Sequence, residues 1–113
     1  MHPRSPQLLE TVRDAGAFIQ EVTQGVTLER YVVDRLLRQA VERNFEIIGE
    51  AIKRLAVADA ATVALISNHQ QIIAFRNVLI HGYDLLDHAL VLDTARRQVP
   101  ALVAQVEALL RGG

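Results

Sequence analysis

Apolar residues recur at helical spacing along most of this chain. The first run of this kind ends before Gly25 and comprises Leu8, Leu9, Val12, Ala15, Ile19 and Val22. Ser5 and Pro6, which precede the run, suit an N-cap and a first helical residue. We therefore predict a first helix that begins at Ser5 and ends near Gly25.

A second, longer helix is predicted to follow Thr27, whose hydroxyl can cap it. Its apolar positions are Val33, Leu36, Leu37, Ala40, Ile47, Ile48, Ala51, Ile52 and Leu55. Charged side chains occupy the opposite side, among them Glu46 and Glu50, one turn apart. With basic neighbours around them, we interpret these two carboxylates as part of a solvated, salt-bridged face and not as an acid and base pair.

Two further helices are predicted in the middle of the chain. Asp59 can cap a short, alanine-rich helix that ends near Ser67 and Asn68, and Asn68 in turn can cap the next helix. Gly82 is expected to end or loosen that helix, because glycine is common just beyond helix ends.

The last helix is expected to begin after a cap at Asp87 and to run over residues 88–110. Pro100 lacks a backbone N–H, so it should kink or split this helix. No alternating pattern typical of strands appears along the sequence. The sequence therefore predicts one domain, residues 1–113, built as an all-α antiparallel bundle of four or five helices with short connections.

Composition and charge limit the partners. Half of the 113 residues are apolar, which indicates that some apolar surface meets a second subunit in a homodimer. The net charge is −1, so contact with RNA would need a local basic patch. Arg35, Arg38 and Arg43 are candidates for that patch, although a charged outer helix face explains them equally well.

Cysteine is absent, which excludes disulfides and thiolate chemistry and fits a reducing cytoplasm. No apolar run approaches the roughly 18 residues of a membrane span, so we expect a cytoplasmic protein. His2, His69 and His88 show no metal-ligand spacing, and neither a metal nor another cofactor is expected.

The stretch FRNVLIHGYD, residues 75–84, differs from the rest of the chain. On an ideal helix Arg76 lies on the same side as Ile72 and Leu79, within an apolar stripe. An arginine in such a stripe is costly unless a carboxylate pairs with it or the stripe faces a wet cleft or a subunit boundary. A structural pair with Glu46 or Glu50 is therefore an alternative to a functional role.

The same stretch holds residue types that suit RNA cleavage. His81 can take a proton from a 2′-hydroxyl near neutral pH, and Arg76 can stabilise charge that gathers on the phosphate. Five residues correspond to a rise of only about 7.5 Å, so both side chains can approach one phosphate, or each His81 can pair with the other subunit's Arg76 in a two-fold dimer. Asn77 is near enough to orient either group. Such a pair would leave a 2′,3′-cyclic phosphate without using a metal.

Arg76, His81 and Tyr83 together form the pattern R-x4-H-x-Y. This pattern, the segment RNFEIIGEAIKRL at 43–55 and Asp87 after HGYDLL resemble the HepT-like toxins of the HEPN superfamily, the ribonuclease halves of HepT/MntA toxin and antitoxin pairs. The resemblance covers essentially the whole chain.

The resemblance implies a homodimeric helical bundle whose two motifs meet in a cleft at the subunit interface. It implies a metal-independent endoribonuclease with transfer RNA among its targets, and places Arg76 and His81 at the catalytic positions. It further implies that an MntA-type nucleotidyltransferase antitoxin adds AMP to Tyr83 and so blocks the toxin. A non-catalytic subunit that binds nucleotide or substrate for a nucleotidyltransferase, and a purely structural dimerisation domain, are the alternatives.

Overall fold

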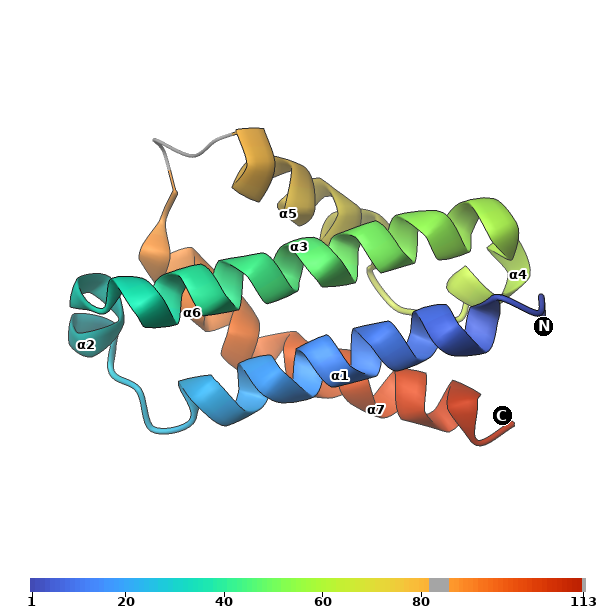
Figure 1. Ribbon diagram of the computed structural model, residues 1–113, viewed down its shortest axis with the longest axis horizontal. Coiled ribbons are helices and arrows are strands. Elements are labelled where there is room, and N and C mark those ends of the chain that lie inside the picture. Colours follow the sequence, from blue (N-terminus) through green and yellow to red (C-terminus); the bar gives the residue numbers. More distant parts are fainter. Residues whose placement is uncertain (82–85, 113) are drawn as a thin grey trace.

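Helices make up nearly all of the chain that the computed structural model describes, residues 1–81 and 86–112. In chain order they are α1 (Ser5–Thr23), α2 (Leu28–Val33), α3 (Arg35–Ala58), α4 (Ala60–Val63), α5 (His69–His81), α6 (His88–Arg97) and α7 (Val99–Leu110). Figure 1 shows α1, α3, α5 and the α6 and α7 pair running in alternating directions, with α2 and α4 as short turns at opposite ends of α3. The predicted all-α antiparallel bundle is confirmed.

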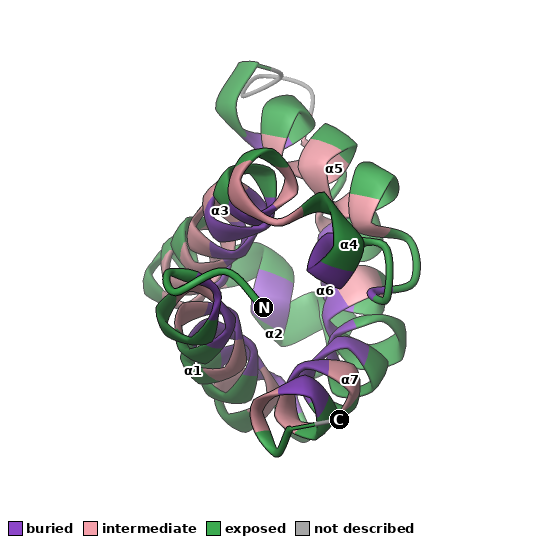
Figure 2. Cartoon of the chain, turned by 90° about the vertical axis from the view of Figure 1, so that its right-hand side faces the viewer, coloured by how far each residue is buried: buried purple, intermediate pink, exposed green. Residues whose placement is uncertain are grey.

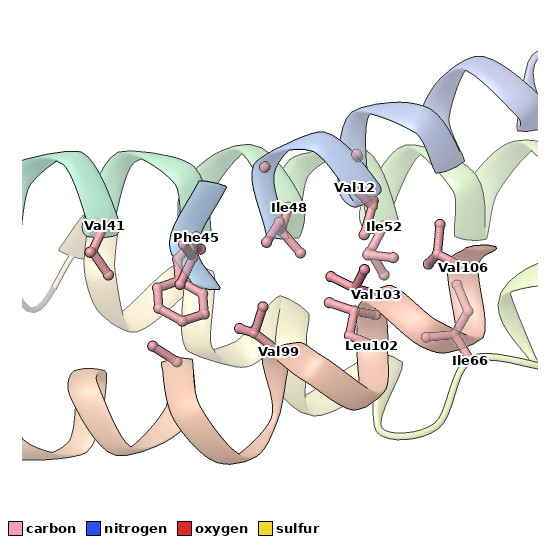
Figure 3. Close-up of a cluster of buried hydrophobic side chains, with 14 of the residues drawn as sticks. Val12, Val41, Phe45, Ile48, Ile52, Ile66, Val99, Leu102, Val103 and Val106 are labelled. Atoms are coloured by element: carbon pink, nitrogen blue, oxygen red, sulfur yellow. The ribbon is translucent and has the colours of Figure 1, made fainter. Parts of the chain in front are cut away.

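The core lies where α1, α3 and α7 pack against one another. Figure 3 shows Val12 of α1 and Ile48 and Ile52 of α3 meeting Val103 and Val106 of α7. Each of these helices places its apolar residues three and four positions apart, so each presents one apolar face to the centre. In Figure 2 the buried residues of these helices accordingly line the inside of the bundle.

A break at Asp34 separates α2 from α3, so the prediction of one continuous second helix is wrong. Thr27 caps α2 as predicted, since its hydroxyl accepts a hydrogen bond of 3.1 Å from the N–H three residues further on. Asp34 has an extended backbone (φ −99°, ψ 90°), and its carboxylate accepts from the N–H of Leu37 at 3.0 Å, which starts a new helix. Because of this break, Val33 and Leu36 of the predicted buried stripe are 80% and 83% exposed.

The predicted cap at Ser5 is also wrong, because Ser5 is already the first residue of α1 and Arg4 occupies the cap position. The Ser5 hydroxyl instead donates to Asp59 Oδ2 at 2.7 Å. The same oxygen accepts from the Thr62 hydroxyl at 2.6 Å and from the N–H of His2 at 2.9 Å. Asp59 thereby ties the start of the chain to the junction of α3 and α4, and it also caps α4 as predicted.

The later helix boundaries follow the predictions in part. Asp87 caps α6, and the last helix is interrupted at Gln98, two residues before Pro100, so the predicted split is confirmed. The short helix α4 ends at Val63, earlier than predicted. Asn68 directly precedes α5 in a left-handed conformation with φ 61°.

Helix α5 lies on the outer side of α3 and packs mainly on that helix (Figures 1 and 2). The rings of Phe45 and Phe75 join the two helices edge to face, with 5.1 Å between their centroids. Gly82, the predicted end of this helix, lies outside the described residues. Over the described ranges, no helix combines the length and the apolar character that crossing a membrane requires.

Hydrogen bonds from Thr62, His2 and Ser5 hold the pKa of Asp59 well below its ordinary value, so this carboxylate should contribute to stability in a pH-dependent way. A carboxylate whose pKa is lower in the folded state stabilises the fold above its unfolded pKa of about 4, and this contribution is lost as pH falls below that value. We expect Asp59→Ala to be clearly less stable than the wild type in urea unfolding at pH 7, and the difference to shrink as the pH falls below about 4. Asp14→Ala, at an exposed position on α1, is the control. An equal difference at all pH values would contradict the role of Asp59.

Candidate functional site

Arg76 lies on the face of α5 that is turned towards α3, and its side chain is 19% exposed. Its Nη2 lies 3.0 Å from Glu50 Oε2, and its Nη1 donates to Asn77 Oδ1 at 3.2 Å. The Nε atom is buried and has no hydrogen-bond partner among the described residues. The predicted cost of an arginine in this stripe is thus offset by a carboxylate, and Glu50 is the partner.

Gly49 makes room for the arginine on α3. A Cβ atom placed on Gly49 would lie against the Arg76 Cβ and within 2.8 Å and 2.9 Å of its Cγ and Cδ atoms. These are the atoms nearest the α5 backbone, so they cannot move aside as the tip of a long side chain would. The close approach of α5 to α3 at this point therefore requires glycine.

Glu50 and Glu46 are both engaged in ion pairs, as the sequence predicts. Glu50 Oε1 accepts from Arg54 Nε at 3.1 Å while its other oxygen meets Arg76. Glu46 lies 3.3 Å from Arg43. The pairs of Glu46 with Arg43 and of Glu50 with Arg54 are exposed, and such pairs are weak, about 0 to 1 kcal/mol, so an anion of another molecule can compete for Arg43 and Arg54.

A groove of about 790 Å³ runs between the first half of α1, the outer face of α3 and α5. Its lining residues are Arg4, Gln7, Leu8, Thr11, Arg43, Glu46, Ile47, Glu50, Ala51, Lys53, Arg54, Val57, Ala58, Arg76 and Ile80. Five of these side chains are cationic and two are anionic, so this cationic groove is a local positive patch on a chain whose net charge is −1. It has the electrostatic character that a phosphate backbone requires.

His81 is the last residue of α5 and is exposed, one position beyond Ile80, where the groove ends on this helix. No hydrogen bond or ion pair joins its ring to another described residue. Arg76 and His81 are separated by a rise of about 7.5 Å along the helix and point to different sides of it. Within one chain, the arginine thus lies on the groove wall and the histidine is exposed at the end of the groove.

Of the three arginines predicted as candidates for an RNA patch, one lines the cationic groove. Arg43 lines the cationic groove, whereas Arg35 is exposed outside it. Arg38 donates through Nη1 to the carbonyl of Val32 and so supports the corner between α2 and α3. Tyr83 falls outside the described residues.

The corner near Arg38 contains a second group of polar side chains. The buried ring of Tyr31 meets the ring of His88 edge to face, with 6.2 Å between centroids. Burial, and secondarily the charge of Glu42, raises the pKa of the Tyr31 hydroxyl, and burial also raises the pKa of Glu42. This group links α2, α3 and α6 and lies outside the cationic groove.

Three of the groove's cations, Arg4, Lys53 and Arg54, and the close contact at Gly49 were not predicted from the sequence. A glycine inside a helix costs about 1 kcal/mol relative to alanine, which is itself a signal that another backbone or side chain approaches closely. In residues 1–81 and 86–112 no three His, Asp or Glu side chains gather as a metal site would require.

Comparisons with known proteins identify the family of this chain. The family model described as "Ribonuclease HepT-like" matches residues 12–109. The chain is 30% identical over 103 residues to a candidate RNase, TTE0752, of Caldanaerobacter subterraneus, with 91% of each chain covered. It is 30% identical over 101 residues to a probable ribonuclease HepT of Thermococcus cleftensis, covering 89% of this chain and 91% of the relative. No solved structure matches the chain significantly.

The fold and the site thus define an all-α protein in which a helix with the spacing Arg-x4-His borders a cationic groove. With the family match over most of its length, the chain belongs to the HepT-like ribonuclease family, hydrolases that act on RNA.

We expect Gly49→Ala to destabilise the fold, although the same change at an open helix position would stabilise it by up to about 1 kcal/mol. The added methyl group meets the Arg76 side chain, and overpacking of this kind costs about 1 to 3 kcal/mol. Urea unfolding of the two proteins measures the difference.

The matched control is the same change in an Arg76→Gly background, which removes the side-chain atoms that a Cβ at 49 would meet. There, the substitution should become neutral or stabilising, and the coupling between the two sites is the measured quantity. An identical effect in both backgrounds would show that Arg76 does not set the requirement for glycine.

Proposed function

We propose that this protein is a metal-independent endoribonuclease toxin that cleaves transfer RNA. The observation that carries the proposal is the placement of Arg76 on the wall of the cationic groove, with His81 exposed at the end of the same helix. An arginine fork beside other cations suits a phosphate, and a free histidine near it suits proton transfer at neutral pH.

The reaction follows from these two groups. His81 takes the proton from an RNA 2′-hydroxyl, and the 2′-oxygen attacks the neighbouring phosphorus in line with the 5′-oxygen. The new bond closes a 2′,3′-cyclic phosphate while the bond from phosphorus to the 5′-oxygen breaks, and that oxygen leaves as a hydroxyl after taking up a proton. Arg76 stabilises the negative charge that develops on the phosphate oxygens. Because in-line attack places the leaving 5′-oxygen on the side of phosphorus opposite to the 2′-oxygen, a second acid is better placed to donate this proton, and a second copy's His81 would supply it.

A homodimer would therefore complete the site. Helix α5 packs mainly on α3, and the α5 residues Val78 and Ile80 are 51% and 37% exposed. Apolar side chains beside a candidate catalytic arginine suit a subunit boundary. In a two-fold arrangement each His81 approaches the other subunit's Arg76, so one cleft contains two complete pairs.

The groove provides the path for the RNA strand beyond the reacting phosphate. Arg43, Lys53 and Arg54 belong to α3 and line the groove together with Arg4, the residue that precedes α1. Arg43 and Arg54 are eleven residues apart, about three helical turns, so they lie on the same side of α3, and Lys53 lines the groove next to Arg54. RNA would bind by its phosphates, which makes binding dependent on salt.

Inhibition of the toxin by an antitoxin is compatible with the same site. AMP added to Tyr83 by an MntA-type nucleotidyltransferase antitoxin would place a bulky anion two residues after His81, where it would repel the phosphate path. The Arg76 and Glu50 ion pair favours a second candidate function, in which the groove binds nucleotide or substrate for the nucleotidyltransferase without cleaving it.

The first test is incubation of the partner-free protein with a transfer RNA pool in EDTA. We expect the wild type to cleave and to leave 2′,3′-cyclic phosphate ends. His81→Ala should lose about 10² to 10⁴ in rate, the usual contribution of a general acid or base. Arg76→Ala should lose activity as well, because the charge on the phosphate is no longer stabilised.

Two controls are needed to interpret these cleavage rates. Each variant is compared at equal folded concentration, and the intact mass of the wild type is measured for an adduct on Tyr83. Unmodified wild type that leaves RNA intact would argue against the ribonuclease and for the binding subunit, whereas His81→Ala that cleaves normally would show that His81 does not carry the proton.

A second test compares Arg43→Gln with Arg35→Gln. Both changes remove one arginine from α3, but only Arg43 lines the cationic groove. We expect Arg43→Gln to weaken RNA binding and to lower the slope of log affinity against log salt by about 0.7, the value for one phosphate contact on a single strand. Equal effects of the two changes, measured by fluorescence anisotropy, would place the RNA elsewhere.

A further inference from the structure

Glu50 and its neighbour Gly49 both lie against the Arg76 side chain. It follows Gly49, the residue whose missing side chain lets the Arg76 stem lie against α3, and its Oε2 atom receives the Arg76 Nη2 group at 3.0 Å. The two adjacent residues of α3 thus act on different parts of one arginine. Gly49 accommodates the stem, and Glu50 meets the charged end.

The guanidinium is held at two of its three nitrogens. Nη2 meets Glu50 and Nη1 meets Asn77, while Nε is buried. Each Nη group carries two hydrogens and uses one of them in these contacts. The other hydrogen on each group can be donated to a phosphate oxygen. Two contacts from different helices fix the plane of the fork before any substrate arrives.

Glu50 itself is held by a second arginine. Arg54 Nε lies 3.1 Å from Glu50 Oε1, on the opposite oxygen from Arg76. A carboxylate bound on both sides has little rotational freedom, so it can orient its partner. Arg54, Glu50 and Arg76 all line the cationic groove.

We infer that Glu50 is a positioning residue for RNA cleavage, which orients the Arg76 fork at the cost of a negative charge in the RNA path. The inference rests on the proposed function and extends it to a residue outside the R-x4-H-x-Y motif. It predicts that removing Glu50 lowers both kcat and KM, and these two changes have opposite effects on kcat/KM. Removing Glu50 leaves the fork free to rotate, which lowers kcat, because misplacement of a catalytic group by about 1 Å can cost up to about 100-fold. Removing its charge makes the groove more positive, which lowers KM.

Glu46 provides a charge-matched control. It lines the same groove on the same helix and pairs with Arg43 at 3.3 Å, not with Arg76. Glu46→Ala and Glu50→Ala therefore remove the same charge from the same surface, and they differ in whether Arg76 loses a partner. We expect KM to fall in both variants, and kcat of Glu50→Ala to be about 10- to 100-fold below that of Glu46→Ala.

A conservative variant separates orientation from charge. Glu50→Gln keeps an oxygen that can accept from Arg76 but carries no charge. It should share the low KM of Glu50→Ala while recovering part of the lost kcat. In an Arg76→Ala background, Glu50→Ala should cause no further loss of kcat, because the group that it orients is absent.

The experiment is steady-state cleavage of a transfer RNA pool by the full chain, with circular dichroism as a check on folding. The inference is overturned if Glu50→Ala and Glu46→Ala have the same kcat, or if Glu50→Ala lowers kcat equally with and without Arg76. Cleavage by the wild type together with loss of activity in Arg76→Ala keeps the proposed function intact in either case. A wild type without activity overturns the proposed function, and the role of Glu50 with it.

Discussion

The close contact between α5 and α3 is the constraint on which the candidate site depends. Helix α3 has two faces in use, since one packs into the core with α1 and α7 and the other carries α5 and the cationic groove. Gly49 sits where the second face meets Arg76. A larger residue there would push α5 outward and separate the arginine from Glu50, so backbone packing and the electrostatics of the site are linked at one position.

The same contact explains how an arginine is tolerated on an apolar helix face. Leu79 of α5 is buried against the bundle while Arg76, three residues earlier, directs its charge to Glu50 and the groove. The long stem is covered by α3, and the charged end remains near solvent. The charge therefore avoids most of the desolvation cost of burial. It also stays available to an anion that enters the groove.

The distribution of charge matters more here than its sum. A net charge of −1 gives no general attraction for RNA, yet the groove gathers cations from α3, from α5 and from Arg4 just before α1 on one side of the molecule. Carboxylates within the groove pair with some of these cations and moderate the field. Such an arrangement favours a strand that follows the groove over indiscriminate binding to any polyanion.

The sequence by itself determined what depends on near neighbours. Helical periodicity, the caps at Thr27, Asp59 and Asp87 and the break near Pro100 are local, so they were predicted correctly. The Arg-x4-His spacing was also visible, as was the need for a partner for Arg76.

Only the tertiary structure decided which carboxylate pairs with Arg76 and where the positive patch lies. The break at Asp34 separates α2 from α3, and α5 packs on α3 from a distant part of the chain. Glu46 and Glu50 are equivalent in the sequence pattern, but only Glu50 follows the glycine at which α5 approaches. Likewise Arg43 and Arg35 look alike in the sequence, and the groove includes one of them. Such choices depend on contacts between helices distant in the chain, which local pattern does not encode.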